Sequence, residues 1–114
     1  MVKLGGRRIH LGEIRSQAQA ISGVVRAAIG MVTHERRTAI ALVIVSEAAT
    51  VCNPSHIRSM LADVLPNYML PGVIRVTDAA RLTANGKSDE RGLIELVQAD
   101  LSRHGFSDGP LVEE

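Results

Sequence analysis

One lysine of this chain stands in a local sequence that is typical of a tight, exposed turn. Lys87 follows Asn85 and Gly86, and both of these residues accept the positive φ angles that tight turns require. A lysine in such a turn presents a compact positive charge with three hydrogen-bond donors. It is therefore suited to stabilise negative charge on a bound or reacting group. From the turn alone, the simpler alternative of a solvated surface lysine stays open.

Other reactive residue types form no recognisable site in the sequence. The histidines lack the spacing of metal ligands, so no metal site is predicted; they are His10, His34, His56 and His104. Ser16 and Ser46 lack the Gly-x-Ser-x-Gly context of a hydrolase nucleophile. The single cysteine, Cys52, cannot form an internal disulfide, and we interpret it as a structural residue.

The composition excludes several classes of partner. The chain has 114 residues, of which 46% are hydrophobic and 2% aromatic, which predicts one domain with an aliphatic core and no aromatic platform for nucleic-acid bases. The net charge of +1 without a long basic run argues against nucleic-acid or membrane binding. The apolar run Ala39–Val45 is too short to span a membrane. With one cysteine and no signal-peptide pattern, a cytoplasmic location is expected.

The first half of the chain predicts a hairpin, a helix and two long strands. Val2–Leu4 and Arg7–Ile9 flank Gly5-Gly6, a pattern typical of a hairpin with a two-residue turn. Apolar residues then recur at helical spacing from Gly12 to Ile21. The β-rich runs Val24–Thr33 and Thr38–Val45 follow, and we expect them to pair antiparallel.

The second half predicts two helices and a short strand. Asn53 and Pro54 are expected to open a helix that Pro66 ends, with the apolar stripe Ile57, Met60, Leu61, Val64 and Leu65. The strand Val73–Val76 follows, and Ser88 or Asp89 is expected to cap a last helix with the stripe Leu93, Leu96, Val97 and Leu101. The predicted fold is α+β: a small, mainly antiparallel sheet of about three strands plus the N-terminal hairpin, packed by three helices.

Three segments together resemble a known family. Residues 2–14, residues 65–71 and residues 82–89 closely resemble the last three core motifs of adenylation domains of nonribosomal peptide synthetases, which belong to the superfamily of acyl-CoA synthetases and luciferases. The form Leu65-Pro66-Asn67-Tyr68-Met69-Leu70-Pro71 is similar to the peptide-synthetase branch. The resemblance extends from Val2 to about Leu101. It implies that residues 1–104 are the C-terminal lid of an adenylation domain, beginning directly after the hinge, and that residues 105–114 are a flexible tail or linker.

The resemblance also implies a mechanism in two half-reactions. A separate N-terminal core would bind ATP, Mg²⁺ and an amino acid or other carboxylic acid, and Lys87 would reach the reacting carboxylate and α-phosphate. The lid would then rotate, and the hairpin at Gly5 and Gly6 would line a channel for the phosphopantetheine arm of a carrier protein. Arg8 matches an arginine of the family motif and would contact the core or the arm. The chain would be inactive without the core.

The chain departs from the family pattern at several positions. Glu90 and Gly5 stand where arginine is common, and Arg15 and His10 replace frequent glutamates. Ala84 replaces a usual proline in the turn before the lysine. The alternative function is a non-catalytic docking or regulatory module that binds a carrier protein or an adenylation core. Retention of the full Asn-Gly-Lys turn favours the catalytic hypothesis, because docking alone would not need it.

Overall fold

The computed structural model describes residues 2–4, 6–46, 53–78 and 89–110. Several residues singled out by the sequence lie outside the described residues: Gly5, Cys52, Ala84, Asn85, Gly86, Lys87 and Ser88. Within the described part, no helix combines the length and the apolar character that crossing a membrane requires.

The centre of the fold is a long antiparallel hairpin. Strands β3 (Val24–His34) and β4 (Arg37–Ser46) pair antiparallel from His34↔Arg37 to Val24↔Ser46, with a shift in register between Val24 and Arg26. Glu35 and Arg36 form the turn with φ angles of 50° and 66°. Two successive left-handed residues match the right-handed twist of the strands. The predicted antiparallel pair is thereby confirmed.

The sheet as a whole is mixed, so the prediction of a mainly antiparallel sheet is wrong. Strand β5 (Val73–Asp78) runs parallel to β4, and the short strand β6 (Gly109–Pro110) runs parallel to β5. Helix α2 (Pro54–Val64) forms the crossover between β4 and β5. A parallel pair requires such a crossover. The sequence pattern identified the strand and the helix but carried no information on the direction of pairing.

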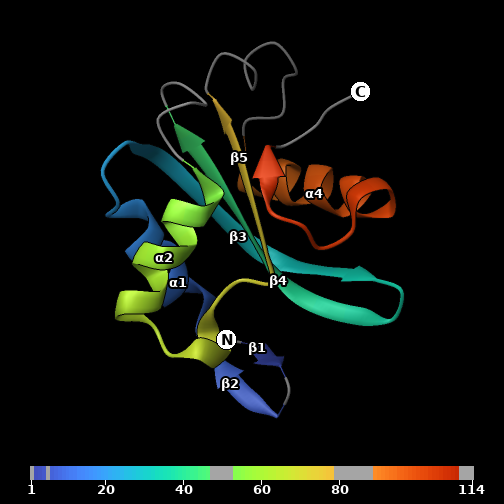
Figure 1. The fold of residues 1–114 in the computed structure, drawn as a ribbon. Helices are drawn as coiled ribbons and strands as arrows, with labels where there is room; N and C mark the ends of the chain where they lie inside the picture. The colour runs from blue at the N-terminus through green and yellow to red at the C-terminus, as the bar shows by residue number, and fades with distance from the viewer. Residues whose placement is uncertain (1, 5, 47–52, 79–88, 111–114) are drawn as a thin grey trace.

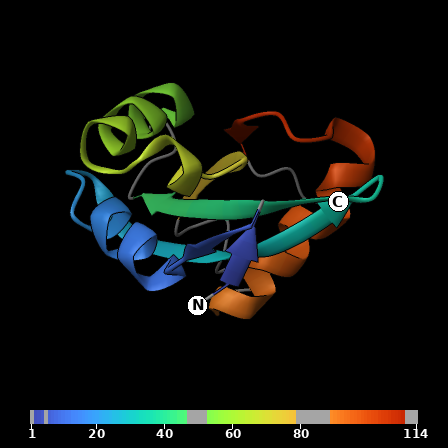
Figure 2. The ribbon, with the colours of Figure 1, turned by 90° about the horizontal axis from the view of Figure 1, so that it is seen from below.

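The three predicted helices are present and cover both faces of the sheet, which confirms the α+β class. Helices α1 (Leu11–Gln19) and α2 pack on one face, and α4 (Glu90–His104) packs on the other (Figure 1, Figure 2). The first core joins α1 and α2 to the sheet through Ile14, Ile57, Leu61, Leu42 and Ile74. The second joins α4 to it through Leu93, Val97, Leu101, Val43 and Val45.

The predicted helix caps are confirmed, but the predicted stripe of α2 is too wide. The Asn53 side chain accepts a hydrogen bond from the Ser55 amide at 2.8 Å, and Asp89 caps α4 through the Gly92 amide at 3.1 Å. Met60 and Val64 are 39% and 56% exposed. Helix α2 lies on the outside of the layered domain, so only the row spaced four residues apart reaches the core.

The N-terminal strands form a separate two-stranded sheet. Strands β1 (Val2–Leu4) and β2 (Arg7–Ile9) pair antiparallel at the lower end of the molecule in Figure 1. The Ile9 side chain is fully buried in the first core. Gly6 adopts a φ of +81°, a conformation that favours glycine.

Residues 105–110 contact the body of the domain. The Arg58 guanidinium donates two hydrogen bonds to Asp108, at 2.8 and 2.9 Å, and Asp108 also accepts one from the Ile74 amide at 2.9 Å. The Phe106 ring meets the His34 ring edge-on, with centroids 5.9 Å apart. The boundary between a lid and a tail after residue 104 stays a prediction, and these contacts hold the first residues beyond it.

Candidate functional site

The first two of the three sequence segments lie against each other. The guanidinium of Arg7, on β2, lies 4.6 Å from the centroid of the Tyr68 ring, a cation–π contact. Tyr68 belongs to the short 3₁₀ helix η1 (Asn67–Met69) and is 43% exposed, whereas Met69 is buried in the first core. Met69 therefore anchors the second segment, and Tyr68 supports the two-stranded sheet from the side.

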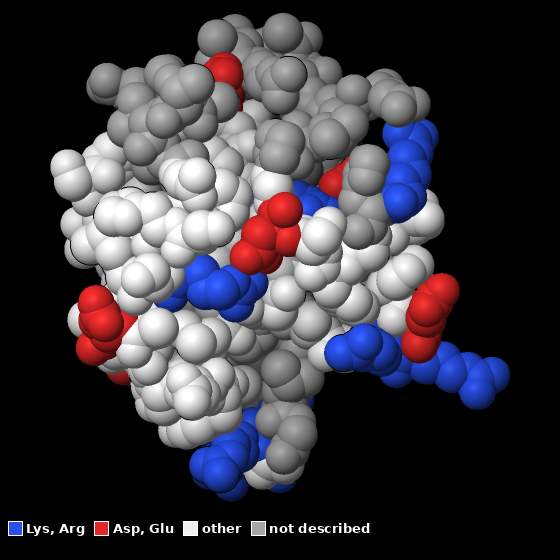
Figure 3. All heavy atoms as spheres, viewed as in Figure 1, with Lys and Arg blue, Asp and Glu red and all other residues white. Residues whose placement is uncertain are grey.

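Exposed cations gather on the two-stranded sheet. Lys3 and Arg8 face each other in register, and both are exposed, as is Arg7. Figure 3 shows Lys and Arg atoms together at this lower end of the molecule. In the part of the chain that the structure describes, neither Lys3 nor Arg8 forms an ion pair. This end of the molecule is therefore suited to an anionic partner group.

The third segment is described only where it enters α4. Its predicted turn residues Asn85 and Gly86, and the predicted catalytic residue Lys87, lie outside the described residues, as Gly5 of the hairpin does. The roles assigned to these four residues therefore stay predictions. The chain leaves β5 at Asp78, and Figure 1 places this end of β5 at the opposite end of the molecule from β1 and β2.

Two departures from the family pattern meet in space. Arg15 of α1 and Glu90 of α4 form an ion pair, with Nη1 and Oε2 3.6 Å apart and side chains 47% and 39% exposed. By the resemblance to adenylation domains, a glutamate was expected in place of Arg15 and an arginine in place of Glu90. One position gains a positive charge and the other a negative one, and this exchange was the one signal in the sequence that could have revealed the ion pair.

A double-mutant cycle tests this pairing. Arg15→Glu and Glu90→Arg each place like charges together, and we expect the double variant to regain a coupling energy of about 0.2–1 kcal/mol because the pair is partly solvated. Urea unfolding of the four proteins measures it, and the coupling should shrink in 1 M NaCl, where screening extends only about 3 Å. Strictly additive single effects would show that the two side chains do not interact.

No metal centre is found among the described residues, since no group of three or more His, Cys, Asp or Glu side chains could hold an ion there. The described surface does carry a groove of about 530 Å³ between β3 and α4.

Curated relatives match nearly the whole chain. The anguibactin system regulator of Vibrio anguillarum is 33% identical over 97% of this chain, and tyrocidine synthase 3 of Brevibacillus parabrevis is 36% identical over 92%. Phenyloxazoline synthase MbtB of Mycobacterium tuberculosis is 32% identical over 96%. The chain spans only 11%, 2% and 8% of these three proteins. No protein-family model matches it.

Solved structures share the fold. A fatty acyl CoA synthetase of Mycobacterium tuberculosis superposes with a TM-score of 0.59 at 22% identity, over 64% of this chain and 14% of that one. ATP-bound MatB from Rhodopseudomonas palustris superposes with a TM-score of 0.58 at 23% identity, over 64% of this chain and 15% of that one. In both, the matched part is a small region of a much larger chain.

Proposed function

Because this chain is homologous to a small part of nonribosomal peptide synthetases and related adenylate-forming enzymes, we propose that it is the C-terminal lid of an adenylation domain. In this role it completes the active site of an N-terminal core that binds ATP, and the substrate is an amino acid or another carboxylic acid. We assign the binding of Mg²⁺ to that core as well.

In the first half-reaction, Lys87 supplies a positive charge next to the reacting groups. Attack of the substrate carboxylate on the α-phosphate forms an acyl-adenylate and releases pyrophosphate, and negative charge accumulates on the oxygens around phosphorus. A desolvated ammonium group offsets this charge where it develops. One structural neighbour was solved with ATP bound, which supports ATP as the nucleotide.

In the second half-reaction, the two-stranded sheet replaces Lys87 in the active site. The thiol of a carrier protein's phosphopantetheine attacks the adenylate, AMP leaves, and a thioester forms. At position 6, the space that a Cβ would occupy has no protein atom within 4 Å. Because glycine has no Cβ, this space stays open and the arm can pass close to the backbone. Exposed Lys3 and Arg8 are suited to the phosphate of that arm.

The observation that carries this proposal is the match of nearly the whole chain to a small part of these synthetases. The two-stranded sheet and the end of β5 at Asp78 lie at opposite ends of the molecule. A lid that carries two functional elements can present them in turn by rotating, so one active site runs two half-reactions.

The test is complementation of an adenylation core. A purified N-terminal core from a related synthetase is mixed with this chain, ATP and candidate amino acids, and pyrophosphate release is followed. We expect release only in the mixture. If the chain binds the core and leaves it inactive, the lid function is refuted and the docking or regulatory function takes its place.

Gly6→Ala separates the half-reactions. The φ of +81° at Gly6 costs an L-residue about 1–2 kcal/mol, so the turn should shift and obstruct the arm. We expect thioester formation to fall by about tenfold, with adenylation unchanged. Gly12→Ala is the matched control, since Gly12 lies in α1 with open space around it. Equal loss of both half-reactions in Gly6→Ala would contradict the assigned role.

A further inference from the structure

The free edge of β3 is closed along most of its length by side chains of two helices. From α1, the Gln19 side chain bonds the Val25 carbonyl at 3.1 Å and the Ala27 amide at 3.0 Å. Arg15 donates to the Ala27 carbonyl at 3.2 Å. Such caps prevent an edge strand from pairing with another chain.

Helix α4 continues the closure with residues spaced four apart. Glu90 accepts a hydrogen bond from the Ile29 amide at 3.2 Å. Gln98 accepts one from the Thr33 amide at 2.8 Å and donates one to the Thr33 carbonyl at 2.6 Å. The position halfway between these two caps is Ile94, which has no polar group to offer.

The closure is therefore interrupted at Met31. His34 and Arg37 flank the two-residue turn, so the even-numbered residues of β3 bond to β4 and the odd-numbered ones face the open edge. No hydrogen bond from the described residues reaches the Met31 amide, the Met31 carbonyl or the Ile29 carbonyl. Ile94 instead packs on Gly30, where a Cβ would lie 3.0 Å from it.

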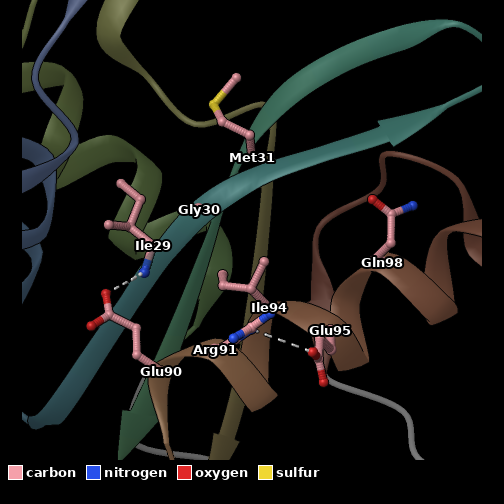
Figure 4. A pocket seen from close by; sticks show the side chains of 8 residues that line it. All are labelled: Ile29, Gly30, Met31, Glu90, Arg91, Ile94, Glu95 and Gln98. Carbon is pink, nitrogen blue, oxygen red and sulfur yellow. Dashed lines mark hydrogen bonds and ion pairs between the residues drawn. The ribbon is translucent and has the colours of Figure 1, made fainter. Parts of the chain in front are cut away.

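These unpaired groups lie in the groove of about 530 Å³ between β3 and α4 (Figure 4). It is lined by the apolar residues Ile29, Gly30, Met31 and Ile94 and by the polar residues Glu90, Arg91, Glu95 and Gln98. The side chains of Ile29 and Met31 also pack against the first core, and Ile94 reaches the groove from α4. The rim charges are already matched within the protein. Arg91 pairs with Glu95 at 3.8 Å, and Glu90 pairs with Arg15. What the groove offers a ligand is thus an apolar floor with one amide donor and two carbonyl acceptors.

We propose that this groove, which we call the Met31 groove, binds an extended, uncharged segment of a partner protein by strand addition at Met31. One residue of the segment exchanges both backbone hydrogen bonds with Met31. The distance from the Ile29 cap to the Thr33 cap is four strand steps, about 13 Å, so about three residues fit. A second copy of this chain carries the same caps on both sides of its own Met31, whereas a free segment can follow the whole groove.

The probe is the capped pentapeptide acetyl-Thr-Val-Thr-Val-Thr-amide, titrated into the ¹⁵N-labelled chain. We expect the Met31 amide resonance to shift and its hydrogen exchange to slow, because it gains an acceptor. Two N-methylated versions of the peptide serve as controls for the register of pairing. In each, the backbone N–H donors of alternate residues are removed. One should bind about tenfold more weakly, corresponding to the loss of one or two backbone hydrogen bonds, and the other should bind as the parent does. Equal binding of both, or no response at Met31, would overturn the proposal.

Variants at two positions test the same geometry from the protein side. Ile94→Gln places an amide at the spacing of the existing caps, and we expect it to close the gap and lower peptide affinity about tenfold. Ile94→Met is the matched apolar control and should bind normally. Gln98→Ala uncovers Thr33 and should strengthen binding. Unchanged affinity in Ile94→Gln, or a dimer in sedimentation whose contact centres on Met31, would refute a partner segment as the occupant.

Discussion

Replacing Lys87 with alanine is expected to lower the rate of adenylate formation by about 10²–10³, the usual effect of removing one charge-stabilising donor from an active site. In the proposed mechanism the Lys87 side chain supplies the ammonium group that offsets charge around the α-phosphate, and alanine removes this group. Pyrophosphate release by the chain mixed with an adenylation core, or by a joined enzyme, measures the effect.

The chain offers a matched control for this substitution. Its only other lysine is Lys3, which lies exposed on β1. Lys3→Ala should leave adenylate formation unchanged. Adenylation at full rate in Lys87→Ala would contradict the catalytic assignment of this residue, and equal losses in both variants would point to a general charge effect.

The largest effect on stability is expected at a buried ion pair. Arg75 in the middle of β5 and Asp100 of α4 have side chains only 2% exposed, with Nη2 and Oδ2 3.0 Å apart. Arg75 also donates hydrogen bonds to the carbonyl groups of Gly105 and Ser107. It therefore ties the end of α4 and the segment leading to β6 to the centre of the sheet.

Arg75→Ala should destabilise the domain by about 3–5 kcal/mol, since it leaves the Asp100 carboxylate buried without this cation. Urea unfolding followed by circular dichroism measures the change. Arg91→Ala, at a side chain 89% exposed, is the control and should cost no more than about 0.5 kcal/mol. The double variant Arg75→Met with Asp100→Leu should recover most of the lost free energy of unfolding, because two buried apolar side chains need no charged partner. A small effect of Arg75→Ala would show that the pair is not buried in solution.

The sequence determined the elements of this protein because their signals are local. A helix or a strand is encoded in the spacing of apolar residues, and a cap depends on one side chain and the next few amides. This is why the strands β3, β4 and β5, the three helices and the caps at Asn53 and Asp89 were predicted correctly, whereas the short strand β6 was not predicted. The resemblance to adenylation domains was also local, since it rests on three short motifs.

Only the tertiary structure decided how distant residues meet. The parallel pairing of β4 and β5 follows from the crossover by α2, which sets direction over long range. The contacts of Arg7 with Tyr68 and of Arg15 with Glu90 join segments far apart in the chain. Arg75 lies between apolar neighbours in β5 and is accommodated because Asp100 and two carbonyl groups reach it. The gap at Met31 arises because a helix rises about 1.5 Å and a strand about 3.3 Å per residue. Four helix residues therefore advance nearly as far as two strand residues, and the row that caps Ile29 and Thr33 places Ile94 between them.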